Sequence, residues 1–444
     1  MRGAEGMASA LAFVALIVGV AATARWRVGR RSRTKRDPGR SVRIGTTRGR
    51  RGHPVELGLD ELQQGVLVGG SPGAGKTRLL AALAARLPEG VGCAFVDLKG
   101  DRSLAGKLGI GSDRVFGLGD RCAASWNPLD AGNPASWRDI LLAAEEWTEP
   151  HYRRAAARFV GALLAALAQV RPTVELDEVI RFLEQPKRAV GLLREVDGRE
   201  RDVLASAIAA IESEASLRSG VLGLGNRLAL LCDSPASGGR LGAAGGIDLR
   251  RALRGERVLF SLPAAEFPDE APAIAASAIQ SLGAAGQRAA LGDETLRAVL
   301  VVDEAPRLGG QQLREAVAIG RGAGIGTVVA VQDFADLDYV ADGTREAVET
   351  GANTWIVMRQ VASAEAIANA LGSRKVKKET IQRDAHRLFF TDTGMRSVRE
   401  VDEYVVSPNV IRGLGRGEAV VWRRLRGRVD RISVEPADAS ERPE

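Results

Sequence analysis

The chain has 444 residues, of which 45% are hydrophobic, so it can form two or three domains with ample cores. Its three cysteines show no paired spacing and its three histidines lie far apart, which argues against a disulfide framework and against a zinc site. The net charge of +7 does not by itself indicate a nucleic-acid-binding surface, because residues 25–51 carry +11 and residues 52–444 carry −4.

The first predicted element is a transmembrane anchor within residues 1–24. Met7 to Ala24 are 18 residues without a charge, just enough to span a bilayer core. Twelve Lys and Arg against one acid follow in residues 25–51, and such positive flanks stay in the cytoplasm. A cleaved secretory signal is the alternative, because Ala22-Thr23-Ala24 resembles a cleavage site. The dense basic run resists translocation, so we expect a single-pass protein of the inner (cytoplasmic) membrane with its bulk in the cytoplasm.

Residues 25–52 read as a basic juxtamembrane linker that ends in a short strand around Ser41 to Ile44. Its Lys and Arg side chains favour contact with anionic lipid headgroups. A first part of an α/β domain is predicted over residues 53–135.

This first part contains the most informative motif of the chain. Gly70 to Thr77 read GSPGAGKT, between an apolar strand-like run and a helix-like run, as a phosphate-binding loop requires. Backbone amides of Gly73, Ala74 and Gly75 can face a phosphate, and the helix that begins near Lys76 adds its positive end. Lys76 would contact the β- and γ-phosphates, and the Thr77 hydroxyl would bind Mg²⁺. We expect ATP to contact Gly70, Ser71, Pro72, Gly73, Ala74, Gly75, Lys76, Thr77 and Arg78.

Strand and helix patterns then alternate, which predicts a mostly parallel sheet covered on both faces. The predicted strands are Val66–Gly69, Cys93–Leu98, Val115–Leu118, Val258–Leu262, Ala298–Val302, Thr327–Val331 and Thr354–Met358. The predicted helices of this part are Arg78–Arg86, Ala271–Leu291, Gln311–Arg321 and Ala362–Leu371.

The alternation stops between residues 136 and 232, where only helical patterns occur. We predict an all-α domain inserted into the α/β domain. Its helices are expected at Trp137–Trp147, Tyr152–Val170, Glu175–Leu183 and Arg201–Ala215. The second part of the nucleotide-binding domain is predicted over residues 233–435, with a terminal β-hairpin from Glu418 to Val434, and residues 436–444 read as a disordered tail.

The sequence VLVVDEAPRL, from Val299 to Leu308, supplies the second half of the ATP site. It places two adjacent carboxylates at the end of an apolar strand, the sheet edge where ligands bind in open parallel sheets. Asp303 would bind Mg²⁺, directly or through water, and Glu304 would orient or deprotonate the attacking water.

Further polar residues lie at the ends of three predicted elements. Arg321 ends a helix and is either a cap for helix carbonyls or an arginine finger. Gln332 ends the next strand, and is either a polar strand end or a group close to the γ-phosphate. Asp97, Lys99 and Asp101 end the second strand at the same sheet edge, and physical reasoning alone reads them as a solvated loop.

Together these motifs resemble the coupling ATPases of conjugative type IV secretion systems, the TraD/TraG group within the HerA/FtsK class. The resemblance spans most of residues 41–424, inserted helical domain included. It is carried by GSPGAGKT (70–77), DLKGD (97–101), SWNPLD (125–130), VVDEAPRL (301–308) and GRGAGIGTVVAVQD (320–333).

The resemblance implies a RecA-like P-loop ATPase that assembles into a homo-hexameric ring. Such a ring would feed DNA, as a relaxase-linked single strand, or a secreted protein into the channel proteins of a secretion system in the membrane. Lys76, Thr77, Asp303 and Glu304 would be catalytic, Gln332 would sense the γ-phosphate, and Arg321 would reach a neighbouring subunit's ATP. The family often has two membrane helices, and a Ser often follows the Gln; this chain has one convincing span, and Asp333 follows Gln332.

Two other functions stay open at this point. One is a double-stranded DNA translocase of the FtsK type, since both groups share the ring core. The other is a membrane-tethered adaptor in which ATP acts as a switch that recruits relaxase or effector. The intact set of Lys76, Asp303 and Glu304 disfavours the adaptor, because a switch could dispense with Glu304.

Overall fold

Seven short apolar strands form the parallel centre of one sheet. The computed structural model describes residues 41–436 except 50, 51, 122, 146, 148, 244, 290–296, 320–322, 387 and 388, and only the backbone of 319, 377–386 and 389–398. The order of the parallel strands is β9-β3-β8-β7-β4-β6-β5. Each lies within two residues of its prediction: β3 (Val66–Gly69), β4 (Gly92–Asp97), β5 (Val115–Gly117), β6 (Arg257–Ser261), β7 (Ala298–Asp303), β8 (Ile325–Val331) and β9 (Thr354–Val357).

Four antiparallel strands extend this sheet beyond β9, giving 11 strands in all. The hairpin predicted near the C-terminus pairs with β9, and an N-terminal hairpin pairs with it in turn. Arg423 is buried in this extension, where its guanidinium lies 2.8 Å from Glu61 and 2.7 Å from Asp430. The four strands are β12 (Glu418–Arg423), β13 (Arg428–Val434), β1 (Ser41–Thr47) and β2 (Pro54–Gly58).

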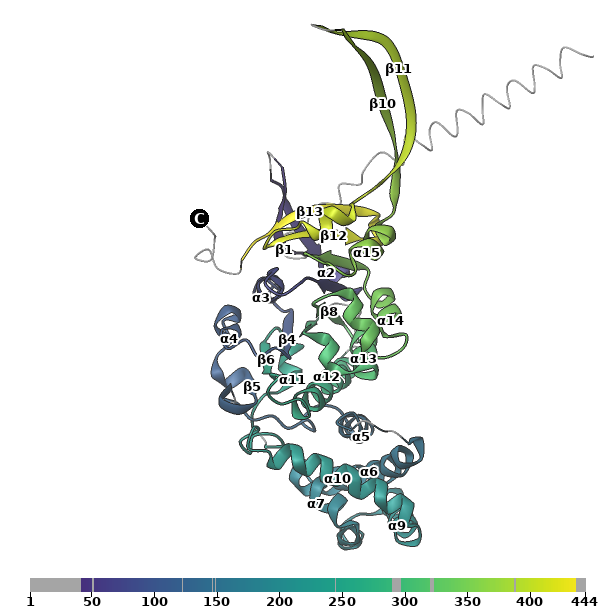
Figure 1. Ribbon diagram of the computed structural model, residues 1–444. Coiled ribbons are helices and arrows are strands. Elements are labelled where there is room, and N and C mark those ends of the chain that lie inside the picture. Colours follow the sequence, from purple (N-terminus) through teal and green to yellow (C-terminus); the bar gives the residue numbers. More distant parts are fainter. Residues whose placement is uncertain are drawn as a thin grey trace, which may run out of the picture. The chain divides into compact units, whose positions relative to one another are not determined.

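Helices cover both faces of the sheet (Figure 1). Successive residues of β3 face opposite sides: Val66 and Val68 pack in one core cluster with Leu80 of α3, and Leu67 belongs to the other cluster with Ile279 of α12. The covering helices are α2 (Leu59–Gln63), α3 (Lys76–Ala85), α4 (Leu104–Leu108), α11 (Leu249–Ala252), α12 (Glu270–Ala289), α13 (Gly310–Ile319), α14 (Thr344–Gly351), α15 (Ala364–Leu371) and α16 (Pro408–Arg412).

A run of helices separates β5 from β6 in the chain, as the sequence pattern predicts. The long helix α10 was not predicted, because Gly220, Gly223 and Gly225 lower its helix propensity. A Cβ on Gly220 would lie 2.8 Å from the Tyr152 carbonyl oxygen, so this glycine allows close packing against α6. The helices are α5 (Pro134–Leu142), α6 (Pro150–Val170), α7 (Leu176–Glu184), α8 (Ala189–Leu192), α9 (Gly198–Ser213) and α10 (Ala215–Asp233).

The SWNPLD motif joins these helices to the sheet. Trp126 is buried, with its ring edge-on to Phe116 and Phe260 at 6.0 and 5.1 Å between centroids. The fully buried Asn127 side chain donates to the Val174 carbonyl at 3.1 Å and accepts from the Leu129 amide at 3.1 Å. The motif therefore acts in packing.

A long hairpin that the sequence did not predict forms a second, two-stranded sheet (Figure 1). Its strands are β10 (Ser373–His386) and β11 (Phe389–Tyr404), paired antiparallel from Ser373 opposite Tyr404 to His386 opposite Phe389. Its sequence is highly charged and lacks the apolar alternation that marks a half-buried strand. The remaining short elements are the 3-10 turns η1 (Ser112–Arg114), η2 (Gly119–Arg121), η3 (Pro186–Arg188), η4 (Ala305–Leu308), η5 (Phe334–Tyr339) and η6 (Arg424–Arg426).

None of the helices within the described residues is both long enough and apolar enough to cross a bilayer. The predicted anchor, Met7 to Ala24, the first part of the basic linker and most of the predicted tail lie outside the described residues.

Candidate functional site

The phosphate loop connects the end of β3 to the start of α3. Gly73 and Gly75 have φ of +78° and +108°, in the left-handed region that favours glycine, and Gly75 is the residue before the first turn of α3. A Cβ on Gly70 would lie 2.8 Å from Cβ of Met358. In this structure the Ala74 amide donates to the Ser71 carbonyl at 3.0 Å. The GSPGAGKT sequence thus forms a tight turn whose glycines the backbone requires.

Lys76 lies in the mouth of this loop with its side chain largely buried. Its ammonium donates to the Gly70 carbonyl oxygen. Burial lowers the pKa of Lys76, while the carboxylates of Asp303 and Glu304 act in the opposite direction and the charge of Lys99 lowers it further. The Lys76 ammonium therefore lies where the phosphates are predicted to bind in a phosphate loop.

The structure brings the two predicted Mg²⁺ ligands together. The Thr77 hydroxyl donates to Oδ2 of Asp303 at 2.9 Å, and Asp303 is 1% exposed at the end of β7. Desolvation raises the pKa of Asp303. Two adjacent oxygen groups beside a phosphate loop fit Mg²⁺, which takes few protein ligands and completes its shell with water and phosphate oxygens. The part of the chain that is described holds no group of three or more His, Cys, Asp or Glu arranged for a metal.

Glu304 and Gln332 also meet at this edge. The Gln332 amide donates to Oε1 of Glu304, and the Glu304 backbone amide donates to Oδ1 of Asp303 at 3.0 Å. Glu304 has φ of +61°, and it is the only non-glycine residue with positive φ among the residues that the structure describes. Such strain costs about 1–3 kcal/mol and clusters at functional sites. The backbone thus holds the Glu304 carboxylate beside the end of β8.

Asp97 corrects the prediction of a solvated loop after β4. It is fully buried, and its Cα pairs with that of Asp303 across β4 and β7. Burial raises its pKa to about 6, with a further contribution from the charge of Asp303. Its oxygens accept the backbone amides of Lys99 at 3.0 Å and Asp101 at 2.7 Å. The carboxylate organises the loop and is not solvated, whereas the Lys99 side chain is exposed.

The raised pKa of Asp97 predicts a pH dependence of stability. The native state holds this proton up to about pH 6 and the unfolded chain only to about pH 3.8, so the contribution of Asp97 is present below pH 3.8 and is lost as pH rises through 6. The loss is up to about 3 kcal/mol. We expect Asp97→Asn to remove this slope in urea unfolding of the nucleotide-free protein between pH 4 and 7. Equal slopes for the two proteins would contradict a raised pKa of Asp97 in the folded protein.

For two other predicted site residues the structure gives less information. Arg78 lies in the first turn of α3, directly after Thr77, and is half-buried. Arg321 lies outside the described residues, so its role stays a prediction.

Two further residues, which the sequence did not predict, hold the backbone of the phosphate loop in place. The Arg359 carbonyl, after β9, accepts the Ser71 amide at 2.7 Å and the Ser71 hydroxyl at 3.0 Å. The Gly417 amide, before β12, donates to the Ala74 carbonyl at 2.8 Å. These segments lie far along the chain and reach the loop only because β9 is the neighbour of β3 and β12 follows β9. No local motif marks them.

Asp333, which follows Gln332, has a structural role. Its side chain accepts the backbone amides of Ala335 at 3.1 Å, Val361 at 3.3 Å and Ala362 at 3.2 Å. It also accepts the hydroxyl of Ser363. The residue therefore fixes the turn after Gln332 against the segment after β9.

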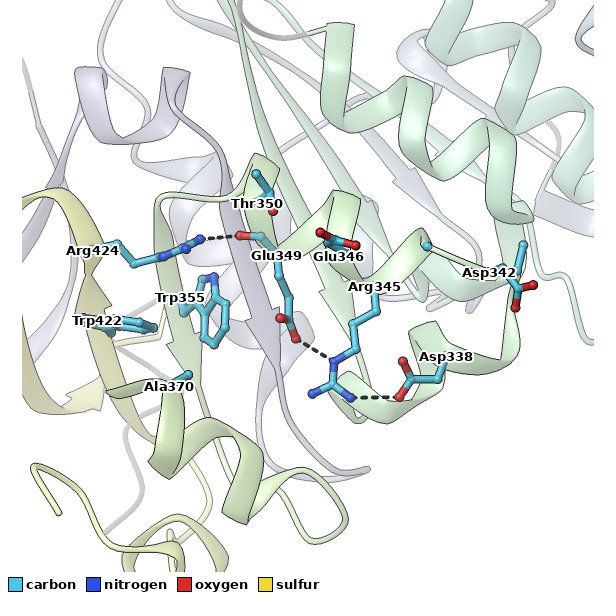
Figure 2. Close-up of a pocket in the computed structure, with 12 residues that line it drawn as sticks. Asp338, Asp342, Arg345, Glu346, Glu349, Thr350, Trp355, Ala370, Trp422 and Arg424 are labelled. Carbon is cyan, nitrogen blue, oxygen red and sulfur yellow. Dashed lines mark hydrogen bonds and ion pairs between the residues drawn. The ribbon is translucent and has the colours of Figure 1, made fainter. Parts of the chain in front are cut away.

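A separate hollow of about 710 Å³, whose lining includes no residue of the phosphate loop, lies at α14 (Figure 2). Within it Arg345 pairs with Asp338 at 2.8 Å and Glu349 at 2.7 Å, and the Arg424 guanidinium lies 5.5 Å from the centroid of the Trp355 ring. Four carboxylates line the hollow against two guanidinium groups, which disfavours a phosphate ligand. The nucleotide is therefore assigned to the loop and not to this hollow. The carboxylates are Asp338, Asp342, Glu346 and Glu349.

Comparisons with known proteins found one matching family and several similar folds. Residues 297–416, about a quarter of the chain, match the family described as "TraM recognition site of TraD and TraG". A search of curated proteins gave no match. Among solved structures, the unbound bacterial conjugative coupling protein TrwBdeltaN70 is similar with a TM-score of 0.64 at 18% identity, over 93% of this chain and 92% of that one.

Two further structures share the fold. TrwB in complex with ADP and Mg²⁺ matches with a TM-score of 0.62 at 18% identity, over 94% of this chain and 93% of that one. VirB4 of Thermoanaerobacter pseudethanolicus matches with a TM-score of 0.53 at 16% identity, over 91% of this chain and 99% of that one. The match over residues 297–416 confirms the resemblance to the TraD/TraG group of coupling proteins, and the chain has the fold of the coupling protein TrwB.

Proposed function

We propose that this chain is the ATP-hydrolysing subunit of a type IV secretion coupling machine. It uses ATP hydrolysis to transfer DNA, as a relaxase-linked single strand, or a protein substrate to a secretion or conjugation channel. The observation that carries the proposal is the assembly of Lys76, Thr77, Asp303, Glu304 and Gln332 at one edge of the sheet. The TrwB structure with ADP and Mg²⁺ supports the choice of nucleotide and metal.

Each of these residues has its own role in the proposed hydrolysis. Lys76 and the loop amides hold the β- and γ-phosphates, and Thr77 and Asp303 hold Mg²⁺, which neutralises phosphate charge when bound. Glu304 accepts the proton of the attacking water, and Gln332, which already contacts the Glu304 carboxylate, orients that water toward the γ-phosphate. In this proposal all five side chains act from one edge of the sheet: Lys76 and Thr77 follow β3, and the other three lie at the ends of β7 and β8.

The arrangement in the cell is part of the same proposal. Met7 to Ala24 anchor the chain in the inner membrane, and the basic residues 25–51 contact anionic lipid headgroups. The chain acts as a homo-hexamer, with the inserted helices of residues 136–232 between the two parts of the nucleotide-binding domain, 53–135 and 233–435. Arg321 reaches the ATP of a neighbouring subunit.

The test is the dependence of ATP hydrolysis on DNA. Full-length protein in lipid nanodiscs is assayed with single-stranded and double-stranded DNA of increasing length, and we expect hydrolysis to rise with the length of the single strand. A rise with double-stranded DNA alone would favour the FtsK-type translocase. ATP-dependent capture of relaxase by protein that does not hydrolyse ATP would favour the adaptor and contradict the proposal.

A further inference from the structure

The turn Asp97–Asp101, at the end of β4, is built more tightly than a solvated loop. The buried Asp97 carboxylate accepts two backbone amides of the turn, and the Asp97 carbonyl accepts the Leu262 amide at 2.8 Å. Gly100 has φ of +78°, and a Cβ there would lie 2.5 Å from Cβ of Pro263. The backbone of this turn is therefore fixed from both sides, and the glycine is required.

The charged side chains of the turn have partners, with one exception. Asp101 accepts the Ser103 hydroxyl at 2.6 Å and the Lys107 ammonium at 3.0 Å. The Lys99 side chain is exposed, and its ammonium makes no hydrogen bond or ion pair with any residue that the structure describes. A rigid turn thus presents a single cation that is not used within the described protein.

The strand order places this cation on the γ-phosphate side of the loop. The parallel strands run β3-β8-β7-β4, so the edge continues from the phosphate loop past Gln332 and Glu304 to Lys99. Asp97 stands directly opposite Asp303 in the β4–β7 pairing. The Lys99 and Lys76 ammonium groups lie close enough for their charges to interact. Two nearby ammonium groups repel each other, and an anion bound between them offsets this repulsion.

We propose that Lys99 is a second cation for the terminal phosphate of ATP, held in place by the Asp97–Asp101 turn. Lys76 contacts the β- and γ-phosphates from the loop, and Lys99 contacts the γ-phosphate from the opposite side of Glu304. This inference rests on the proposed nucleotide site. It adds a specific consequence: Lys99 distinguishes a triphosphate from a diphosphate.

The test compares Lys99→Gln with Arg102→Gln in the full-length protein. Arg102 supplies the matched control, because it lies three residues further, carries the same charge and pairs with Asp120 at the exposed surface. Binding of a non-hydrolysable ATP analogue and of ADP, each with Mg²⁺, is measured by titration. We expect Lys99→Gln to lower the affinity for the analogue about 10-fold or more and the affinity for ADP by less than about 2-fold. The reason is that one charge-assisted contact is lost only with the triphosphate. Arg102→Gln should leave both affinities unchanged, and Lys99→Arg should retain most of the analogue's affinity.

The outcomes separate this inference from the proposed function. If Lys99→Gln lowers the affinity for both nucleotides equally, or lowers neither, the proposed role of Lys99 is wrong. The proposed nucleotide site is not contradicted by either result. A wild-type protein that binds neither nucleotide contradicts the site itself. Because the Lys99 side chain is exposed, the variant should melt at the wild-type temperature, and a lower melting temperature would assign Lys99 a structural role.

Discussion

Glu304→Gln is expected to bind ATP as the wild type does and to hydrolyse it about 10²–10⁴-fold more slowly. The amide keeps the shape of the carboxylate and can still contact Gln332, but it cannot accept a proton from water. The strained backbone at Glu304, with φ of +61°, is unchanged by this substitution. Binding is measured with labelled ATP, and turnover is measured as phosphate release.

Glu212→Gln is a suitable control, because Glu212 is exposed on α9 and the substitution is chemically identical. This variant should hydrolyse ATP at the wild-type rate. If Glu304→Gln loses nucleotide binding together with turnover, the Glu304 carboxylate is part of the structure of the site and does not act as the base.

Arg321→Ala is expected to reduce ATP hydrolysis by about 10³–10⁵-fold, the range for an arginine that stabilises a transferring phosphoryl group. If Arg321 acts on a neighbouring subunit's ATP, mixing Arg321→Ala protein with Lys76→Ala protein should restore part of the activity. Some interfaces of the mixed ring then join a sound phosphate loop to a sound arginine. Activity of the mixture is compared with that of each parent.

Co-assembly of the two variants must be shown in the same mixture, for example by two different affinity tags. A co-assembled mixture as inactive as its parents would return Arg321 to the alternative role, a cap for the carbonyls at the end of α13.

The phosphate loop and the candidate catalytic residues could be predicted from the sequence because their signals are local. A phosphate loop needs a strand, a glycine turn and a helix within a few residues, and all of these are contiguous around Lys76. Asp303 ends a fully buried strand and Glu304 follows it, so their place at the ligand-binding edge follows from the parallel sheet. The meeting of Glu304 with Gln332 required only that β7 and β8 be neighbours, which they are.

The rest depended on contacts between distant segments. Local polarity around Asp97 suggested solvent, and only its pairing with Asp303 on the neighbouring strand shows that the carboxylate is buried. The antiparallel extension of the sheet brings Arg359 and Gly417 to the phosphate loop, and no periodicity encodes that strand order. Helix α10 was missed because its glycines oppose helix formation locally, while close packing favours them.

The most direct test of the central claim is ATP hydrolysis by the full-length protein and by Lys76→Ala. Lys187→Ala, an exposed lysine in the helical segment, is the matched control. We predict that wild type and Lys187→Ala hydrolyse ATP only with Mg²⁺ present, and that Lys76→Ala is about 10²-fold slower or worse, because the loop amides alone cannot compensate the charge of the phosphates. Hydrolysis by Lys76→Ala at the wild-type rate would contradict a reaction carried out at this phosphate loop.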